Sequence, residues 1–263
     1  MRLVTWNVNS LKQRMPRVFE LLDQHAPDVV ALQETKILGD AFPHDELAMA
    51  GYRAVEHSEG RWNGVALLAP VDVEVADVQV GLPGEPAAAE ARWIEASVGG
   101  VRVVSVYIPN GRTPNHPMFA VKLAFLDEMR DRVTTLVARG APTVIAGDFN
   151  IAPEERDVWD PASFVGSTHV TPDERGRLAA IMDCGLVDAF RVVEPDAIGF
   201  TWWDYRVGAF HRGMGMRLDL ALVSDHLDVA GCTIDTTYRR QNRAGDKPSD
   251  HAPLVVDLLH RTA

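Results

Sequence analysis

The stretch Pro142-Thr143-Val144-Ile145-Ala146-Gly147-Asp148-Phe149-Asn150 decides how the rest of this 263-residue chain is organised. Its β-branched and small apolar residues, followed by a Gly-Asp pair, predict a buried strand that stops at a loop. Asp148 and Asn150 are two residues apart, so we expect both side chains on the same side of a sheet edge. A carboxylate there can hold or deprotonate a water molecule, and an amide can stabilise an oxyanion. An ordinary turn is the alternative, because Asp and Asn are common where strands end.

Composition and charge narrow the class of protein. With 46% hydrophobic residues the chain can bury a sizeable core, and no apolar run approaches the roughly 20 residues that span a bilayer. The first predicted strand begins at Arg2, so we expect no signal peptide, a cytoplasmic location and reduced thiols at Cys184 and Cys232. A net charge of −11 argues against a generally basic nucleic-acid surface. It does not exclude a metal-dependent nuclease, whose carboxylates gather around cations while one local basic face contacts phosphates.

Sequence patterns predict two groups of strands with helices between them. Apolar and alternating runs predict strands over 2–9, 28–34, 52–57, 63–69, 71–80, 91–98, 101–107, 142–146, 217–223, 229–236 and 254–259. Amphipathic patterns predict helices over 15–25 and 118–139, and Thr171-Pro172-Asp173-Glu174 predicts a capped helix that ends at Gly185. Residues 81–89 predict a loop, and Gly99-Gly100 predicts a hairpin turn. Because nothing resembles a linker, we expect two packed sheets in a single domain, residues 1–263.

Polar residues stand at the ends of these apolar strands. They are Asn7, Glu34, Tyr107, Asp148, Asn150, Asp219, Asp250 and His251. The strand–helix–strand order over 2–34 predicts that the first two lie side by side. A carboxylate beside an apolar strand is costly to desolvate unless it is paired or bound to a metal, so the set predicts a shared centre. Oxygen ligands without Cys or paired His favour Mg²⁺ or Mn²⁺ over Zn²⁺, and such a centre suits phosphodiester hydrolysis.

These residues lie in eight motifs that occur in sequence order along essentially the whole chain. The motifs are Thr5-Trp6-Asn7-Val8-Asn9-Ser10, Gln33-Glu34-Thr35-Lys36, Trp62-Asn63-Gly64-Val65, Tyr107-Ile108-Pro109-Asn110-Gly111, Gly147-Asp148-Phe149-Asn150-Ile151-Ala152-Pro153, Trp202-Trp203-Asp204-Tyr205-Arg206, Arg217-Leu218-Asp219 and Ser249-Asp250-His251-Ala252-Pro253. Together they resemble the exonuclease III class of abasic-site endonucleases, within the endonuclease/exonuclease/phosphatase superfamily. The resemblance implies a DNase I-like, four-layer α/β sandwich, in which two mixed, mostly antiparallel β-sheets pack face to face and are flanked by helices.

The resemblance also implies a role for each residue of the site. Glu34 would be the principal metal ligand, with Asn7 and Asp250 near the same Mg²⁺ ion, for which Mn²⁺ could substitute. Asp148 would orient and deprotonate the attacking water, helped by Asn150. A carboxylate that holds a histidine fixes the tautomer of the imidazole and favours its charged form.

The resemblance also implies that Asp219 holds His251, and that His251 and Tyr107 face the scissile phosphate. The alternatives are that His251 is a structural histidine and that Tyr107 is an ordinary interface tyrosine. The residues that the resemblance places against DNA are Asn110, Arg112, Trp202, Arg206, Met216, Leu218 and Lys247.

Trp202, with Met216 and Leu218, would wall an apolar pocket for a flipped-out sugar that lacks its base. Arg112 and Arg206 are candidates for inserting into or clamping the duplex. A basic stretch would contact backbone phosphates, although a solvated loop is an equal alternative; it consists of Arg239, Arg240, Arg243 and Lys247. Composition alone favours core packing for Trp202 and Trp203. Three histidines lack ligand spacing, and we expect them to be surface or loop residues: His116, His169 and His211.

The sequence therefore predicts a Mg²⁺-dependent DNA repair hydrolase. It would cleave the phosphodiester on the 5′ side of abasic sites, and the resemblance also implies 3′→5′ exonuclease and 3′-phosphodiesterase activity on duplex DNA with blocked 3′ ends. We expect no membrane association, no obligate protein partner, and a place on the nucleoid when DNA is bound. Two alternatives stay open: a phosphodiesterase of the same superfamily that acts on phosphoinositides, sphingomyelin or nucleotides, and a non-catalytic DNA-binding relative.

Overall fold

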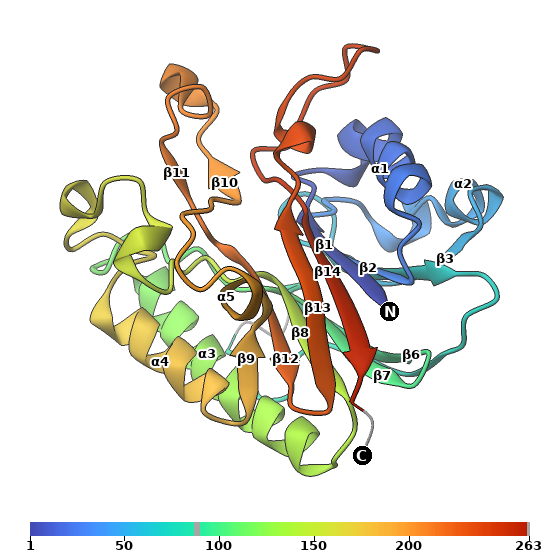
Figure 1. The fold of residues 1–263 in the computed structure, drawn as a ribbon, viewed down its shortest axis with the longest axis horizontal. Helices are drawn as coiled ribbons and strands as arrows, with labels where there is room; N and C mark the ends of the chain where they lie inside the picture. Colours follow the sequence, from blue (N-terminus) through green and yellow to red (C-terminus); the bar gives the residue numbers. More distant parts are fainter. Residues whose placement is uncertain (87–89, 262–263) are drawn as a thin grey trace.

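Two six-stranded sheets form the centre of the molecule (Figure 1), and the computed structural model describes residues 1–86 and 90–261. The first sheet has the strand order β13 (Leu227–Ile234), β14 (Leu254–His260), β1 (Arg2–Asn7), β2 (Val29–Gln33), β4 (Val65–Pro70) and β3 (Tyr52–His57). The second has the order β5 (Val75–Val80), β6 (Trp93–Val98), β7 (Val101–Tyr107), β8 (Thr143–Asp148), β12 (Asp219–Ser224) and β9 (Leu186–Asp188). A short antiparallel ribbon joins β10 (Trp202–Trp203) to β11 (Gly215–Met216).

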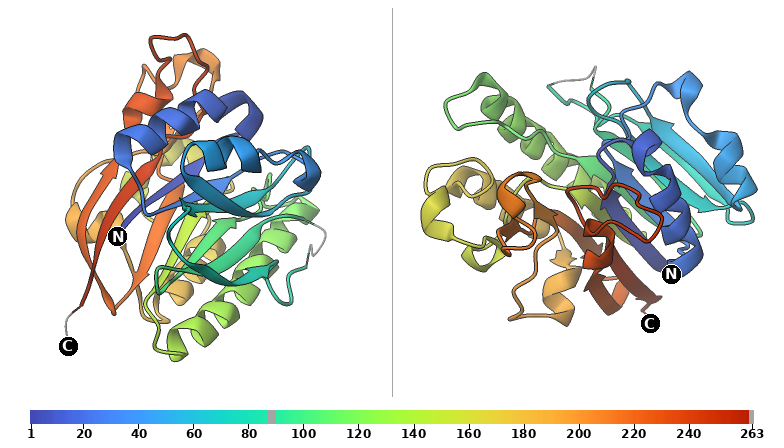
Figure 2. Two further views of the ribbon diagram at one scale, coloured as in Figure 1. Left: turned by 90° about the vertical axis from the view of Figure 1, so that its right-hand side faces the viewer. Right: turned by 90° about the horizontal axis from the view of Figure 1, so that it is seen from above.

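Helices cover the outer face of each sheet. In the described residues these are α1 (Leu11–His25), α2 (His44–Met49), α3 (Pro117–Ala138) and α4 (Pro172–Met182). The short helix α5 (Ala189–Val193) instead packs Ala189 and Phe190 into the core between the sheets. Turns of 3₁₀ helix lie at 39–41, 155–157, 161–164, 206–208 and 236–239. Side chains of α1 and α2 pack on the first sheet, and those of α3 and α4 pack on the second. Figure 2 shows α1 and α2 on one side of the stacked sheets and α3 on the other. Within the described ranges no helix has the length and apolar character needed to cross a membrane.

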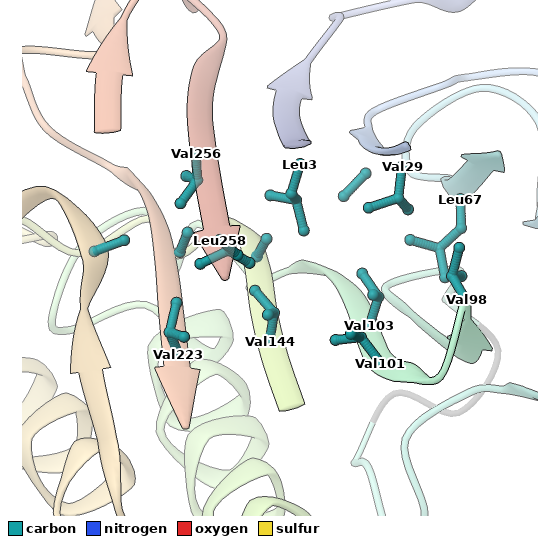
Figure 3. Packing of buried hydrophobic residues seen from close by; sticks show 14 of the residues in the cluster. Leu3, Val29, Leu67, Val98, Val101, Val103, Val144, Val223, Val256 and Leu258 are labelled. Carbon is teal, nitrogen blue, oxygen red and sulfur yellow. The ribbon is translucent and has the colours of Figure 1, made fainter. Parts of the chain in front are cut away.

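The main apolar core lies between the two sheets (Figure 3). Leu3 and Val29 of the first sheet face Val103 and Val144 of the second, and all four side chains are fully buried. Burying such aliphatic side chains is the dominant stabilising contribution to a sandwich of this kind. The helix–sheet–sheet–helix order confirms the predicted four-layer α/β sandwich.

Strand pairing brings the polar strand ends to one edge of the sandwich. β1 and β2 are parallel, as are β7 and β8, whereas the other pairs of the described strands in these two sheets are antiparallel. Tyr107 is opposite Asp148 in the parallel pair, and Asp219 begins β12 opposite Asp148 in the antiparallel pair. The βαβ start and the mixed sheets are therefore confirmed.

Some boundaries differ from those predicted from sequence. Helix α1 begins at Leu11 rather than Met15, because Leu11 is fully buried in the outer core and its amide donates to the Thr35 carbonyl. Strand β1 ends at Asn7 rather than Asn9, since Asn9 has a positive φ of 44°. Strand β5 begins only at Val75, strand β12 runs over Asp219–Ser224, and α4 ends at Met182. Of the predicted loop over 81–89, residues 87–89 lie outside the described residues.

Gly147 sets a test of the packing between β7 and β8. A Cβ atom at this position would lie 1.9 Å from the Val106 carbonyl oxygen, which belongs to a strand that cannot move away. We predict that Gly147→Ala lowers the free energy of unfolding by about 3 kcal/mol, the upper range for overpacking. Gly176→Ala is the control, because Gly176 lies in α4 with open space around it, and it should add about 0.5–1 kcal/mol. Urea unfolding of both variants measures the difference; equal stability would contradict the predicted clash.

Candidate active site

The site lies where the two sheets present their strand ends side by side. Asn7 ends β1, and Glu34 follows β2 with a positive φ of 52°, which turns the chain out of the sheet. From the second sheet, Tyr107 ends β7 and Asp148 ends β8. His251 directly precedes the last strand, next to β1, so five separated segments supply one centre.

Asn7 connects the carboxylates of the two sheets. Its Nδ2 atom donates to Glu34 Oε1 at 2.8 Å and to Asp148 Oδ2 at 2.9 Å. One ligand atom from each of Glu34, Asp148 and His251 lies within 4.8 Å of the other two. Asn7 and Asp148 are buried, so the centre is largely shielded from water.

His251 lies between two carboxylates of the second sheet. Its Nδ1 atom is 2.8 Å from Asp219 Oδ2, and its Nε2 atom is 3.8 Å from Asp148 Oδ2. Burial would lower the pKa of His251, but the charges of Asp219 and Asp148 outweigh burial and raise it to about 10. Burial raises the pKa of the Asp148 carboxyl to about 7, against the opposing charge of His251. In the absence of a metal, the arrangement therefore favours a protonated imidazole.

Asn150 turns back toward Asp148 instead of continuing the strand. It has a positive φ of 52°, and its backbone N–H donates to Asp148 Oδ1 at 2.9 Å. Its side-chain Nδ2 donates to the Ile108 carbonyl at 2.9 Å, and its Oδ1 accepts from Asn110 Nδ2 at 3.2 Å. The amide thus fixes one oxygen of Asp148 through the backbone and ties together the two loops that follow β7 and β8.

Tyr107 is half-buried beside the acids. Burial raises the pKa of its hydroxyl well above the ordinary value, and the charges of Glu34 and Asp148 add to the effect. The guanidinium of Arg92 lies 4.8 Å from the centre of the Tyr107 ring and donates to the Tyr107 carbonyl at 3.3 Å. The hydroxyl therefore remains protonated and can donate a hydrogen bond to an anion.

Asp250 belongs to an adjoining group of contacts rather than to the three-residue cluster. Its Oδ1 accepts from Asn9 Nδ2 at 2.9 Å, and its Oδ2 accepts from Trp202 Nε1 at 3.2 Å. Burial opposes ionisation, but the charge of His251 and these hydrogen bonds hold the pKa of Asp250 below its usual range. Lys36 Nζ, 2.6 Å from both Glu34 Oε2 and Asn9 Oδ1, links this group to Glu34.

The donor set fits a hard divalent cation. Glu34 and Asp148 supply carboxylate oxygens, and Asp219 Oδ1 is buried without a hydrogen-bond partner among the described residues. Carboxylate oxygens are the ligands that Mg²⁺ and Mn²⁺ prefer. Asn7, however, faces the acids with its amide nitrogen, and its Oδ1 accepts from the Asn9 amide at 3.0 Å. As a ligand it would have to present its oxygen instead.

The predicted apolar wall is only partly open to solvent. Met216 and Leu218 are only 1% and 3% exposed. They pack with Val158 and Ala152 beneath the half-buried Trp202. Trp202 is therefore the member of this group that presents surface beside Asp250. Trp203 is a core residue that packs edge-on against Phe210 with ring centres 5.0 Å apart.

Most of the predicted basic and polar DNA contacts are exposed. Asn110, Arg112 and Lys247 lie at the surface, and the first two lie on the loop that leaves Tyr107. Arg206 is exposed, but its guanidinium pairs with Asp204 at 2.9 Å, which reduces its free positive charge. Arg239 corrects the prediction of a basic phosphate-binding stretch, because its guanidinium is buried and donates to the Trp203 carbonyl at 3.1 Å.

Sequence analysis missed several residues that support the site. Arg92 stacks on Tyr107, whereas Lys122 and Glu174 form a buried ion pair beneath the loops of Asn110 and Asn150. The capping box had singled out Glu174 only as a helix cap, a role that the structure confirms. No local pattern reveals the partnership with Lys122, because 52 residues separate the two.

His116 and His169 lie in loops, as expected, but both also make contacts that the sequence did not reveal. The Nδ1 atom of His169 pairs with the Asn150 carbonyl, and its Nε2 lies 3.5 Å from Asn110 Nδ2. Burial, aided by the charge of Lys122, lowers the pKa of His169 to about 4, so the ring is neutral at physiological pH. His116 caps α3 by accepting from the Met118 amide at 3.1 Å.

Comparison with known proteins gives the family. The Endonuclease/Exonuclease/phosphatase family model matches residues 4–251. Exodeoxyribonuclease III of Haemophilus influenzae is 31% identical over 273 residues, which cover 98% of this chain and 100% of that protein. A structure of the 3′ phosphatase NExo from Neisseria, bound to a product DNA hairpin, has a TM-score of 0.93 and 37% identity, covering 98% of both chains. An AP endonuclease from Archaeoglobus fulgidus has a TM-score of 0.92 and 33% identity, again covering 98% of both chains.

The chain belongs to the endonuclease/exonuclease/phosphatase family. Within that family, the resemblance to the exonuclease III class is confirmed, since relatives of that kind align with the chain over nearly its full length.

The charge of His251 gives a pH test. We predict that, in EDTA, both ring nitrogens of His251 remain protonated at about pH 8, because the two flanking carboxylates raise the pKa to about 10. Because this value lies above the unfolded value of about 6.5, the stabilisation is fully present below about pH 6.5 and is lost as pH rises through about 10. ¹⁵N NMR of the histidine rings measures the state directly, and Asp219→Asn should lower the titration midpoint. A neutral ring at pH 8 would show that burial lowers the pKa of His251 more than the two carboxylates raise it.

Proposed function

We propose that this chain is a Mg²⁺-dependent DNA repair hydrolase that cleaves the phosphodiester on the 5′ side of abasic sites and processes the 3′ ends of duplex DNA. The observation that carries the proposal is the cluster of Glu34, Asp148 and His251 within 4.8 Å at the joint edge of both sheets. It lies in a chain whose relatives are named exodeoxyribonuclease III, 3′ phosphatase and AP endonuclease. Both activities are hydrolyses of a phosphate ester in DNA, so one centre can serve them.

Asp148 is the proposed general base. Its Oδ1 is fixed by the Asn150 amide and its Oδ2 by Asn7 Nδ2, so the carboxyl has a set orientation. A pKa of about 7 suits a base that takes a proton from water near neutral pH. Asp148 would hold the attacking water by hydrogen bond and accept its proton as the water attacks phosphorus.

His251 and Tyr107 are the proposed stabilisers of negative charge on the phosphate. Asp219 fixes the orientation of His251 through Nδ1 and leaves Nε2 directed toward the centre. A protonated imidazole and a protonated phenol placed beforehand can stabilise charge that develops in the transition state. The amide of Asn150 would contribute in the same way if DNA displaces its present contacts.

Glu34, with Asp250 and the Asn7 amide nearby, would hold the Mg²⁺ ion, and Mn²⁺ could substitute. When bound, the cation would supply charge neutralisation at the phosphate and polarise its oxygens. Trp202 would contact the deoxyribose beside the scissile bond, and Asn110, Arg112 and Lys247 would contact the DNA backbone, which gives affinity without sequence preference. Residues 1–263 would act as a single domain in the cytoplasm, with no obligate protein partner.

The proposal predicts metal-dependent cutting of two labelled duplexes, one with an internal abasic analogue and one with a 3′-phosphate. With Mg²⁺, we expect a nick 5′ of the lesion and loss of the terminal phosphate, and with EDTA we expect neither. Product lengths on a denaturing gel and released phosphate measure the two reactions. If both duplexes stayed intact in Mg²⁺ and in Mn²⁺, the DNA-hydrolase proposal would be wrong; cleavage of a small phosphodiester would then favour the alternative phosphodiesterase.

Asp148→Asn tests the proposed base. We predict that the variant binds the abasic duplex with wild-type affinity but loses at least ~3 kcal/mol of transition-state stabilisation, the scale of a principal acid–base or electrostatic element. Single-turnover rates and binding in EDTA separate the two effects. Asp131→Asn, at the exposed Arg130–Asp131 pair on α3, is the control and should cut at the normal rate. Near-normal turnover by Asp148→Asn would remove Asp148 from the mechanism.

A further inference from the structure

Lys122 and Glu174 form an ion pair that is completely buried. Lys122 Nζ lies 2.5 Å from Glu174 Oε1, and neither side chain is exposed. A buried ion pair is often no more stable than an apolar pair of the same volume, since both charges lose their hydration. Stability alone is therefore a weak explanation for this pair.

The contacts of Lys122 converge on the loops of the active site. Its Nζ atom donates to the Asn150 carbonyl at 2.7 Å, with longer contacts of 3.4 Å to the Asn110 carbonyl and to Thr168 Oγ1. These residues belong to the loops after β8 and β7 and to the segment before α4. One ammonium group thus fixes the positions of three loops relative to one another.

Glu174 completes the arrangement from the other side. Its Oε1 accepts from Thr168 Oγ1 and from the His169 amide, both at 2.9 Å. Its Oε2 accepts from the amide and hydroxyl of Thr171 at 3.0 and 2.7 Å. Each oxygen of the carboxylate is fully used, so the ion pair has one defined geometry.

Only one residue separates this ion pair from the proposed base. Lys122 holds the carbonyl of Asn150, and the amide of the same residue donates to Asp148 Oδ1 at 2.9 Å. Asn150 adopts a positive φ of 52°, a left-handed conformation that Asn tolerates better than most other non-glycine residues, and this turn directs its amide back to Asp148. Loss of the Lys122 contact would remove one restraint on the Asn150 backbone, and through it would loosen the hydrogen bond that orients Asp148 Oδ1.

We propose that Lys122 and Glu174 are positioning residues for hydrolysis, which fix Asp148 through Asn150 and hold the Asn110 and Thr168 loops beside it. The inference rests on the proposed role of Asp148 as the base. It assigns the ion pair no contact with DNA and no proton transfer. An apolar pair in place of Lys122 and Glu174 could not donate hydrogen bonds to the carbonyl groups of Asn110 and Asn150, whereas the Lys122 ammonium group does.

The same helix offers a matched control. Arg132, ten residues further along α3, contacts the fully buried Glu95, which also pairs with Arg102 at 2.6 Å. Arg102 lies at the start of β7, at the opposite end of this strand from Tyr107. Arg132→Met therefore removes an α3 cation from a buried glutamate on β6 without touching a loop of the active site.

The experiment compares Lys122→Met with Arg132→Met and the wild type. Urea unfolding measures stability, binding to an abasic duplex in EDTA measures affinity, and single-turnover cutting in Mg²⁺ with enzyme in excess measures the chemical step. We expect Lys122→Met to cut about 10- to 100-fold more slowly, the scale for a misplaced catalytic group, with a smaller change in affinity. Arg132→Met should cut within about twofold of the wild type, and it should lose less stability than Lys122→Met because Arg102 still pairs with Glu95.

Two results would overturn the proposal: equal cutting rates of the two variants, or a rate loss in Lys122→Met that is matched by the loss of affinity. Thr168→Val provides a milder test if Lys122→Met does not fold. It removes the hydroxyl group that lies within hydrogen-bond distance of both the Asn110 carbonyl and Glu174 Oε1. It should slow cutting by about three- to tenfold. A normal rate in that variant would also overturn the proposal. A wild type that cuts neither duplex would instead refute the proposed function.

Discussion

The structure depends on holding three carboxylates close together where little water reaches them. Asp148 and Asp219 face each other across two strands, and Glu34 approaches Asp148 from the other sheet. Like charges at this separation repel, and burial adds a cost for each ionised group. The raised pKa of Asp148, about 7, expresses that cost in the metal-free protein. The repulsion between these carboxylates favours the binding of cations, and the protonated imidazole of His251 is one such cation.

The fold supplies the counterparts of these charges in successive layers. Asn7 donates to Glu34 and Asp148, and His251 lies beside Asp148 and Asp219. Lys36 pairs with the second oxygen of Glu34. Beneath them, Lys122 holds the backbone that holds Asp148. The rigid sandwich keeps these distances, because Asn7, Glu34 and Asp148 stand at or just beyond the ends of strands that are packed on both faces. Precise electrostatics at one edge therefore follow from ordinary apolar packing in the middle.

Sequence analysis predicted what local pattern and strand order can reveal. Alternation and apolar runs predicted the strands, and polar residues at their ends identified Glu34, Asp148 and His251, which the structure brings together. It could not predict that Asn7 would present its nitrogen, because the orientation of an amide depends on partners from other strands. Lys122 lay in an amphipathic helix like any other polar residue, and its role depends on contacts with distant loops. The early start of α1 likewise depends on burial of Leu11, which tertiary packing decides.

We propose that the converging carboxylates hold a divalent cation beside Asp148, the proposed base. Crystals of the protein grown with Mn²⁺ would test it directly through an anomalous difference map. We expect one dominant peak against the Glu34 carboxylate, between it and Asp148 or Asp250. A map without a peak at Glu34, or with its only strong peak elsewhere on the molecule, would show that these carboxylates do not hold the cation.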